Sequence, residues 1–223
     1  MQTTEGPLAI GGVWAEAPDS NLFYATQRSW LHAASRVFLG LRLRGAERIP
    51  ATGGVMLVAN HVSYLDPTTI ACGLPRQIHF LAKQELLDTP GLGWYLRHVN
   101  THAIKRGGGD RAAIRASVEV LKAGHAMLIF PEGTRSHDGA PGEPKPGAAM
   151  IALQAGVPVV PVHIEGTFRA LPRGARFPRP ARVTVTVGEP FDPGTVADSA
   201  PDRRTRYEVL GRNMMERIAA LAH

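Results

Sequence analysis

From about residue 55 onwards, the chain alternates short apolar runs with longer segments in which apolar residues recur at helical spacing. Short apolar runs predict buried strands, and their alternation with helical segments is typical of βαβ units. We therefore expect an α/β fold with a mostly parallel central sheet flanked by helices. The predicted strands are residues 55–59, 78–81, 102–104, 127–130, 157–164 and 182–187.

Three predicted helices have recognisable ends. One begins after the N-cap residue Asp110 and ends at Gly124, with an inward face of Ile114, Val118 and Leu121. Another covers about residues 148–155 and stops at the Gly156 to Pro158 turn. The last follows Asp202 and places on one face Tyr207, Leu210, Met214, Ile218 and Leu221.

Residues 1–45 are predicted to form an N-terminal segment with one amphipathic helix, and residues 46–223 a single α/β domain, because no linker divides it. The apolar positions of this helix are Trp30, Ala33, Ala34, Val37, Phe38 and Leu41, and the basic ones are Arg28, Arg36, Arg42 and Arg44. Such a stripe can pack on the core, the commoner case, or lie in a lipid interface, and the two interpretations are not exclusive. The pattern leaves both interpretations open.

Composition limits the class of protein and of partner. With 223 residues, 44% of them hydrophobic and 20% charged, the chain is long enough to bury a core. Its net charge of +6 favours a polyanionic partner, which is a nucleic acid, an anionic membrane surface or a phosphorylated substrate. The basic segment at residues 169–182 holds five arginines, three prolines and no acidic residue, which predicts a solvated loop.

Cysteine content and apolar run length suggest where the protein works. Cys72 is the only cysteine, which excludes an internal disulfide and favours a reducing compartment. Residues 1–19 lack the pattern of a secretory signal. No apolar run approaches the roughly 20 residues that a transmembrane helix needs. We therefore expect a peripheral contact with the cytoplasmic face of a membrane.

Polar side chains directly follow four of the predicted strands. They are His61, Lys83, Arg106 and Glu132. In open α/β sheets, ligands bind at the carboxyl ends of the strands, so these groups are expected to converge on one site. That site would combine one base with several cations.

His61 is followed five positions later by Asp66, just before Pro67. A carboxylate that accepts one imidazole N–H raises the basicity of the other ring nitrogen, which suits deprotonation of an alcohol. The alternative is that Asp66 only caps the helix beginning at Pro67. The chain contains neither a Gly-x-Ser-x-Gly elbow nor a His-Glu-x-x-His zinc motif, so no metal is expected.

The run from Phe130 to Ser136 places glycine, threonine and arginine directly after a strand. Backbone N–H groups near Gly133 and Thr134 and the guanidinium of Arg135 would together suit a phosphate. Arg106, before three glycines, is a second candidate for such an anion. The alternative is a plain turn in which Glu132 accepts from its own loop amides and Arg135 faces solvent. No nucleotide-binding P-loop is present.

Together these motifs resemble the lysophosphatidate (1-acylglycerol-3-phosphate) acyltransferase family, the PlsC-like glycerolipid acyltransferases. The resemblance covers residues 54–167 and follows the family's order. Its first motif matches from Asn60 to Pro67, its third from Phe130 to Ser136, and its fourth at residues 157–162. The second motif keeps Arg106 but has Asn100 and Ala103 where glycine and a larger apolar residue are usual.

The resemblance implies an O-acyltransferase and a role for each matched residue. His61, steadied by Asp66, would deprotonate the acceptor hydroxyl, and Lys83 would face the thioester oxygen or the donor. The residues that would position the acceptor phosphate are Arg106, Glu132, Gly133, Thr134 and Arg135. The acceptor would be 1-acylglycerol-3-phosphate and the donor acyl-CoA or acyl carrier protein, without a cofactor.

Two alternatives stay open at the level of the sequence. The altered second motif is compatible with another acceptor, such as a lysophospholipid, an ornithine lipid or a glycolipid. A non-catalytic module that binds membrane or nucleic acid through residues 169–182 is the alternative of another class. A charge patch alone would not need the pair formed by His61 and Asp66, so we expect no nucleic acid partner.

Overall fold

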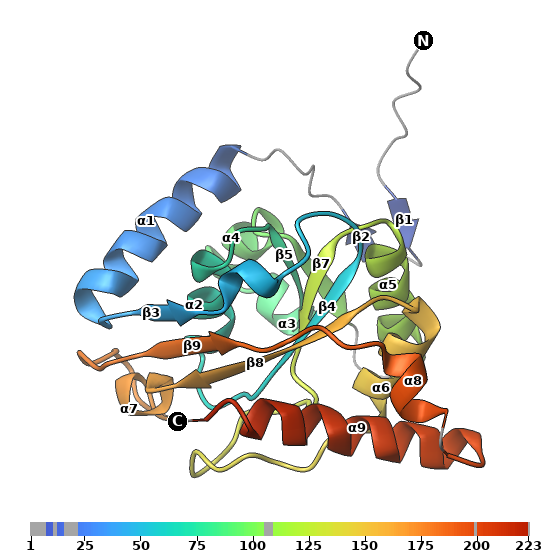
Figure 1. Cartoon of the computed structure of the whole chain (residues 1–223). Coiled ribbons are helices and arrows are strands. Elements are labelled where there is room, and N and C mark those ends of the chain that lie inside the picture. The colour runs from blue at the N-terminus through green and yellow to red at the C-terminus, as the bar shows by residue number, and fades with distance from the viewer. Residues whose placement is uncertain (1–7, 11–12, 16–21, 105–108, 199, 223) are drawn as a thin grey trace.

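A central sheet organises the computed structural model of this protein, which describes residues 8–10, 13–15, 22–104, 109–198 and 200–222. Within these residues, seven strands form the sheet in the order β3-β9-β8-β4-β7-β5-β6 (Figure 1). Their bounds are β3 Arg42–Arg44, β4 Val55–Ala59, β5 Ile78–Lys83, β6 Thr101–Ile104, β7 Ala126–Ile129, β8 Val159–Glu165 and β9 Thr184–Val187. All six predicted strands are therefore confirmed, with ends shifted by one or two residues at most sites.

The sheet is mostly parallel, as predicted. Strands β4, β7, β5 and β6 are parallel neighbours, and β8 runs parallel to β4 on its other side. Strand β9 pairs antiparallel with β8, and β3 pairs parallel with β9. Because the short helix α7 (Thr167–Ala170) and a loop return the chain to the same edge, no crossover intervenes between β8 and β9.

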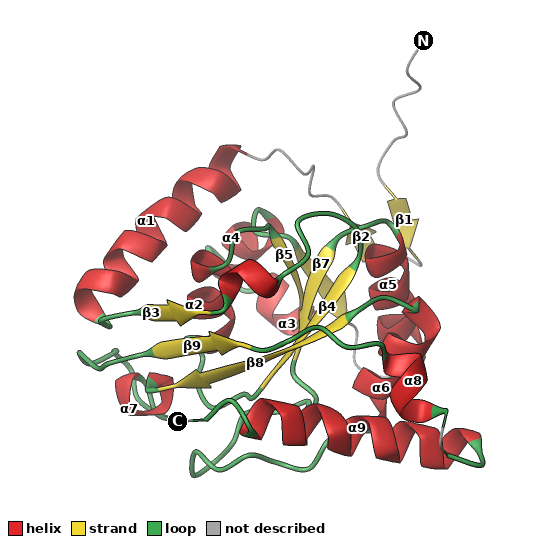
Figure 2. Cartoon of the chain, viewed as in Figure 1, coloured by secondary structure: helices red, strands yellow, loops and turns green. Residues whose placement is uncertain are grey.

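Helices cover both faces of the sheet (Figure 2). Along β4, the side chains of Val55, Leu57 and Ala59 join one buried cluster and those of Met56 and Val58 the other, as expected of a strand buried on both faces. The first cluster includes helix α2 (Asp66–Gly73), and the second includes α5 (Gly109–Lys122), α6 (Pro146–Ala155) and α9 (Arg203–Ala219). The remaining helices are α1 Leu22–Phe38, α3 Gln84–Leu87, α4 Leu92–Arg97, α8 Pro193–Ala197 and a 3-10 turn at Ala46–Arg48.

The three helices predicted with ends are confirmed. Helix α9 is capped by Asp202, whose carboxylate accepts from the N–H groups of Arg204 and Thr205. Helix α6 ends at Gly156, which adopts a left-handed φ of 63°. Helix α5 begins at Gly109, one residue before the predicted cap. Most of the predicted inward residues are buried, namely Ile114, Val118, Leu121, Leu210, Met214 and Ile218. Tyr207 is only half-buried, and Leu221 lies beyond the end of α9.

Helix α1 lies with its apolar side away from the protein. It begins eight residues before Trp30 and ends at Phe38, so Leu41 falls outside it. Trp30 is 74% exposed and Val37 is 89% exposed, so the core-packing interpretation of the stripe is wrong. The opposite side, which includes buried Tyr24 and partly buried Leu31 as well as polar groups, contacts α2 and the residue after it. Arg28 Nη1 donates to Leu74 O at 3.0 Å, and His32 Nδ1 donates to Cys72 O at 3.2 Å.

Two features of the N-terminal segment were not predicted from the sequence. Strand β3, which is Arg-Leu-Arg, joins the edge of the central sheet rather than the amphipathic helix. Residues Leu8–Ile10 and Val13–Ala15 form β1 and β2, an antiparallel pair outside that sheet. Among the described helices, none is both long and apolar enough to cross a bilayer.

Candidate active site

The ends of four parallel strands bring the predicted site together. In the sheet, β4, β7, β5 and β6 are consecutive, and their registers align Val58 with Ile129 and Lys83 with Ile104. The residues that follow these strands therefore leave the same edge. His61 and Glu132 lie there side by side, and Lys83 is the last residue of β5.

His61 and Asp66 form the predicted pair. His61 Nδ1 lies 2.9 Å from Asp66 Oδ2, and the carboxylate is fully buried while the imidazole is 17% exposed. The same oxygen accepts the N–H groups of Val62 and Ser63, each at 2.7 Å. Three donors therefore converge on one carboxylate oxygen and fix both the loop and the ring.

The alternative role of Asp66 as a simple helix cap is wrong. Asp66 is the first residue inside α2, Leu65 occupies the N-cap position, and no side-chain cap bond is made there. The carboxylate instead points back along the chain to the loop that carries His61. Its second oxygen, Oδ1, is buried without a partner among the described residues. Its hydrogen bonds therefore fix the loop of His61 rather than the end of the helix.

The hydrogen bond to Asp66 determines which imidazole nitrogen is free to act. An ionised carboxylate can only accept, so Nδ1 is the donor in this contact, and in a neutral imidazole the lone pair is then on Nε2. The ring of Phe130 stacks on the imidazole with 3.9 Å between centroids and 16° between planes. Contacts on its edge and on its face therefore hold the ring, while Nε2 makes no hydrogen bond to any described residue.

Glu132 contacts backbone rather than open space. Its side chain is buried, Oε1 accepts the N–H of His61 at 2.9 Å, and Oε2 accepts the N–H of Gly142 at 2.9 Å. The peptide of Ser136 donates to His61 O at 2.8 Å. The third motif therefore holds the base from both sides, and Glu132 has its carboxylate occupied by amides of two different loops.

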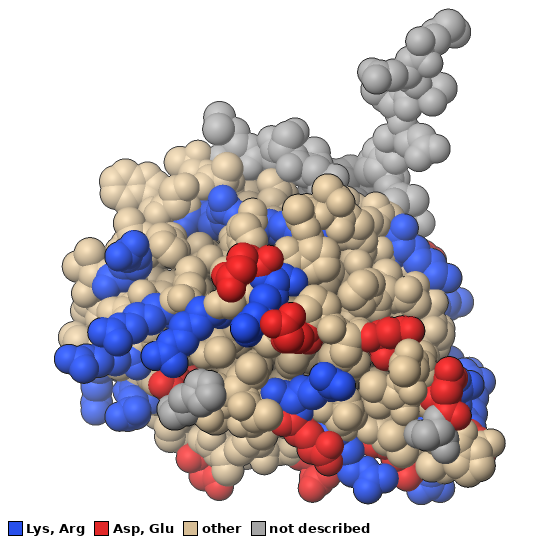
Figure 3. Space-filling view, in the orientation of Figure 1, with Lys and Arg blue, Asp and Glu red and all other residues tan. Residues whose placement is uncertain are grey.

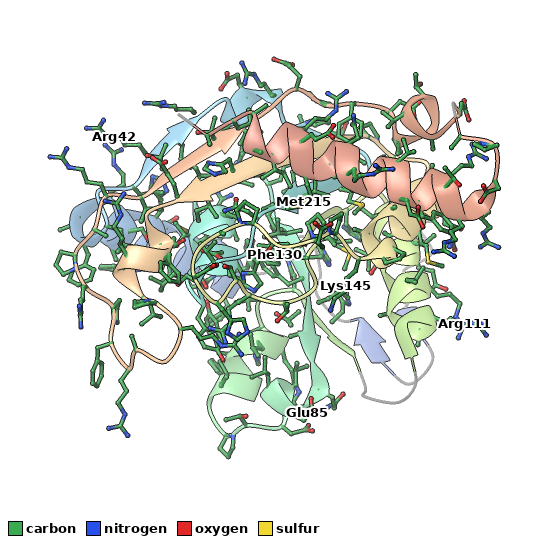
Figure 4. The ribbon with its side chains drawn as sticks, turned by 90° about the horizontal axis from the view of Figure 1, so that it is seen from below. Arg42, Glu85, Arg111, Phe130, Lys145 and Met215 are labelled. Carbon is green, nitrogen blue, oxygen red and sulfur yellow. The ribbon has the colours of Figure 1, made fainter. Side chains whose placement is uncertain are left out.

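Arg135 and Lys145 place cationic groups beside this loop. The guanidinium carbon of Arg135 lies 3.3 Å from the ring centre of Tyr64, and its Nη1 is buried without a hydrogen bond to a described residue. Gly133 has φ +63°, and a Cβ built there would lie 3.3 Å from Nζ of Lys145. Phe130 and Lys145 lie near the centre of the view from below (Figure 4). Thr134 is exposed between Gly133 and Arg135.

Two predicted site residues are only partly placed. Lys83 ends β5 at the correct edge, but its side chain is not among the described ones. Arg106 lies outside the described residues, two positions after the end of β6 at Ile104. Their roles at the site therefore stay predictions.

Sequence reasoning missed three residues that build the site. The Asn60 carboxamide pairs with the backbone of Ile164 in both directions, at 2.8 and 2.9 Å, and so extends the contact of β4 with β8. Ser63 Oγ donates to Leu171 O at 2.8 Å. Lys145 lies near Gly133 although it is 12 residues away in the chain. Apart from being a lysine, it has no feature in the sequence that indicates a role at the site. Buried Asn and Ser side chains form hydrogen bonds and often position a neighbouring base. The closeness of Asn60 and Ser63 to His61 in the sequence could therefore have indicated their roles.

A separate group of histidines lies in the core. His79 Nδ1 and His102 Nε2 are 2.9 Å apart, and the ring of His125 stacks on that of His79 at 4.6 Å. Burial, with the neighbouring imidazoles, lowers the pKa of His79 to about 3 and that of His102 to about 4. No group of three or more metal-ligating side chains with suitable geometry occurs in the described part of the chain. His79 and His102 are therefore neutral, buried residues at physiological pH.

Comparisons with known proteins agree with this geometry. The family model described as Acyltransferase matches residues 40–165. A 1-acyl-sn-glycerol-3-phosphate acyltransferase of Bacillus subtilis is 30% identical over 153 residues, covering 68% of this chain and 74% of that protein. A chloroplast protein of Arabidopsis thaliana with the same named activity is 32% identical over 149 residues, covering 66% of this chain and only 42% of that protein.

A solved structure is similar over most of the chain. The crystal structure of PlsC, the 1-acyl-sn-glycerophosphate acyltransferase of Thermotoga maritima, has a TM-score of 0.68 and 30% sequence identity. The match covers 88% of this chain and 79% of that one. The matched family region contains His61, Asp66 and the whole run from Phe130 to Ser136. The chain is an acyltransferase and belongs to the PlsC-like family.

Proposed function

We propose that this acyltransferase moves a fatty acyl group from a thioester to the hydroxyl of 1-acylglycerol-3-phosphate, with His61 as general base. The observation that carries the proposal is the 2.9 Å contact of His61 Nδ1 with Asp66, which leaves Nε2 as the ring nitrogen available to the acceptor hydroxyl. The named activities of the Bacillus and Thermotoga relatives support the choice of acceptor.

The reaction needs one proton transfer in each direction. Nε2 of His61 takes the proton of the acceptor hydroxyl while the oxygen attacks the thioester carbonyl carbon. The C–S bond then breaks, and the imidazolium returns the proton to the leaving thiolate. Asp66 stabilises the imidazolium between these steps. No covalent acyl-enzyme is required, and we assign Lys83 to the negative charge that develops on the carbonyl oxygen.

The acceptor phosphate would bind at the turn of the third motif. Arg135, with an unpartnered buried Nη1, and Lys145, whose Nζ lies near Gly133, supply two cations there. We assign Arg106 and the backbone around Thr134 to the same anion. Glu132 acts through the loop, because both of its oxygens already accept backbone N–H groups.

Asn100, one of the two departures in the second motif, does not by itself argue for another acceptor. Asn100 stands where the family usually has glycine, and its φ of 55° is the only positive value at a non-glycine among the described residues. Asparagine tolerates this left-handed conformation better than most other residues. The substitution therefore keeps the backbone shape that glycine would allow, and the acceptor assignment stands on the third motif.

The donor would be acyl-CoA or acyl carrier protein, without a cofactor. The exposed apolar side of α1, which includes Trp30, Val37 and Phe38, would enter the lipid interface and make the enzyme peripheral. We place this contact at the cytoplasmic face, where both donors occur. No nucleic acid partner is proposed.

Replacement of the base tests the central assignment. His61→Ala is expected to abolish transfer to 1-acylglycerol-3-phosphate, measured by mass spectrometry of the lipid product, with an unchanged circular dichroism spectrum. His137→Ala is the matched control, because His137 is exposed in the loop after the third motif and is expected to retain activity. Full activity of His61→Ala would overturn the proposal, and preference for an unphosphorylated acceptor would overturn the choice of substrate.

A further inference from the structure

A cavity of about 510 Å³ lies at the edge of the sheet formed by β3, beside the end of β8, and its lining residues do not include those of the site around His61. Its charged lining consists of Arg42 and Arg44 on β3, Glu165 at the end of β8, Arg169 on α7, and Arg182 before β9. We call this cavity the arginine pocket. Lysine and arginine side chains gather over this end of β3 and β9, at the left of the space-filling view (Figure 3).

Among the described residues, no ion pair neutralises the arginines of the arginine pocket. Four guanidinium groups face one carboxylate, and none of the four forms an ion pair or a side-chain hydrogen bond with a described residue. Two arginines elsewhere on the surface show what an ion pair looks like in this protein. Arg48 contacts Glu189 at 2.8 Å and Arg206 contacts Asp198 at 2.6 Å. Unpaired guanidinium forks around a cavity are suited to a phosphate.

Exposed apolar side chains flank the arginine pocket on both sides along the chain. Val37 and Phe38 end α1 just before Gly40, which lines the pocket, and they are 89% and 45% exposed. Phe177, 79% exposed, lies three residues before the lining residue Pro180. Basic groups set among exposed apolar side chains are typical of a surface that lies at the level of lipid headgroups.

The arginine pocket is also connected to the active-site loop. Ser63, in the loop between His61 and Asp66, donates to Leu171 O at 2.8 Å, and Leu171 directly follows α7, which carries Arg169. Figure 4 shows Arg42 on the side of the molecule that carries α1, with Phe130 nearer the centre. A lipid held in the pocket would therefore set the height of the active site above the membrane.

We propose that the arginine pocket binds the phosphate of an anionic phospholipid headgroup in the bilayer, at a site separate from that of the acceptor. The inference rests on the membrane contact proposed for α1 and deepens it. The apolar side chains of α1 would enter the lipid interface, and the arginine pocket would select the headgroup. The enzyme would then favour membrane regions rich in anionic lipid. The phosphorylated diacyl product of the proposed reaction is itself such a lipid.

Vesicle sedimentation tests the pocket. The probes are vesicles of phosphatidylcholine alone and of phosphatidylcholine mixed with phosphatidylglycerol. Arg42→Gln with Arg182→Gln is expected to weaken binding to the mixed vesicles about 10-fold or more, and binding to the neutral vesicles little. The Arg42 backbone, which donates to Val183 O, keeps its place in the sheet in this variant.

A control of equal charge separates the pocket from general attraction. Arg204→Gln with Arg206→Gln removes two positive charges from α9, where both are ion-paired, and is expected to change binding less than about twofold. An equal loss in both double variants would overturn the proposal in favour of diffuse charge. Unchanged binding of Arg42→Lys with Arg182→Lys would do the same, because lysine keeps the charge but loses the guanidinium fork.

The donor is the other molecule whose phosphates fit this chemistry. A raised KM for acyl-CoA in neutral detergent micelles, with unchanged vesicle binding, would reassign the pocket to the donor and overturn the proposal. Vesicle binding of His61→Ala is expected to equal that of the wild-type protein. The failure of the pocket and the failure of the proposed catalytic role therefore give different results.

Discussion

The guanidinium carbon of Arg135 lies 3.3 Å from the ring centre of Tyr64, so the third motif rests on a side chain of the loop that carries the base. Tyr64 is 62% exposed, and among the described residues its ring has no other cation–π contact. The contact orients the arginine that we assign to the acceptor phosphate. Such a cation–π contact contributes about 0.5–1 kcal/mol at an exposed position.

Tyr64→Leu is therefore expected to raise the KM for 1-acylglycerol-3-phosphate about threefold to fivefold, with little change in kcat. Tyr64→Phe keeps the ring face and is expected to behave like the wild-type protein. Steady-state kinetics with varied acceptor concentration measure both. Equal effects of leucine and phenylalanine would show that the hydroxyl, and not the ring, matters.

Lys145→Met is expected to raise the KM for the acceptor about 10-fold, because a charge-assisted hydrogen bond to phosphate would be lost. Its ammonium lies beside Gly133 in the turn that we assign to that phosphate. Lys122→Met, on the exposed last turn of α5, removes the same charge and is the control. The idea fails if both variants have the wild-type KM.

Glu132→Gln separates a structural role of this residue from direct substrate contact. Glutamine has one acceptor oxygen for two backbone donors, those of His61 and Gly142, so one of these part-buried N–H groups loses its acceptor. We expect the free energy of unfolding in urea to fall by about 1–3 kcal/mol and kcat to fall with it. Glu143→Gln, exposed in the same loop, is the control. A raised acceptor KM at unchanged stability would instead indicate direct contact.

Val37→Asp tests the outward face of α1. Because Val37 is 89% exposed, the charge costs little in water, and the free energy of unfolding is expected to stay within about 0.5 kcal/mol. Sedimentation with phosphatidylcholine vesicles is expected to fall strongly, since a carboxylate is costly in the lipid interface. Ala112→Asp, exposed on α5, introduces the same charge elsewhere. Unchanged vesicle binding of the Val37 variant would remove α1 from the membrane contact.

The buried imidazoles of His79 and His102 make stability depend on pH. Their pKa values are lowered to about 3 and about 4, whereas the unfolded chain protonates both near pH 6.5. Between these values the unfolded state binds more protons, so their contribution to stability is complete above about pH 6.5 and decreases as the pH falls. The expected slope is about 1.4 kcal/mol per pH unit for each histidine.

Urea unfolding at a series of pH values measures this slope. His79→Leu is expected to reduce it by about half, and His137→Gln, at an exposed position, is expected to leave it unchanged. A slope that is the same in the wild-type protein and in His79→Leu would mean that other groups control acid unfolding.

The strands and the catalytic pair were predictable because they depend on local pattern. Val55 to Ala59 is an unbroken apolar run, and the five-residue spacing from His61 to Asp66 is set within one loop. Strand β3 was not predictable in this way, since Arg-Leu-Arg contributes a single apolar residue and owes its place to β9. Short edge strands lack the sequence signal of buried ones.

The rest depends on partners that are distant in the chain. Periodicity indicates that Trp30 and Val37 share a side of α1, but it does not indicate whether protein or lipid covers that side. The role of Glu132 depends on the amides of His61, 71 positions earlier, and Gly142, 10 positions later. Spacing along the sequence does not reveal contacts between distant residues. For this reason the sequence alone predicts that Glu132 positions the acceptor phosphate, rather than the loop of His61.

The exposed apolar side of α1 is stabilised only where little water contacts it, as in a lipid interface. In dilute buffer, two copies of this protein can bury Trp30, Val37 and Phe38 by packing these apolar surfaces against each other. Dimers or larger particles found during purification would then report the removal of lipid rather than a native assembly. Mild detergent should disperse them without loss of transfer activity.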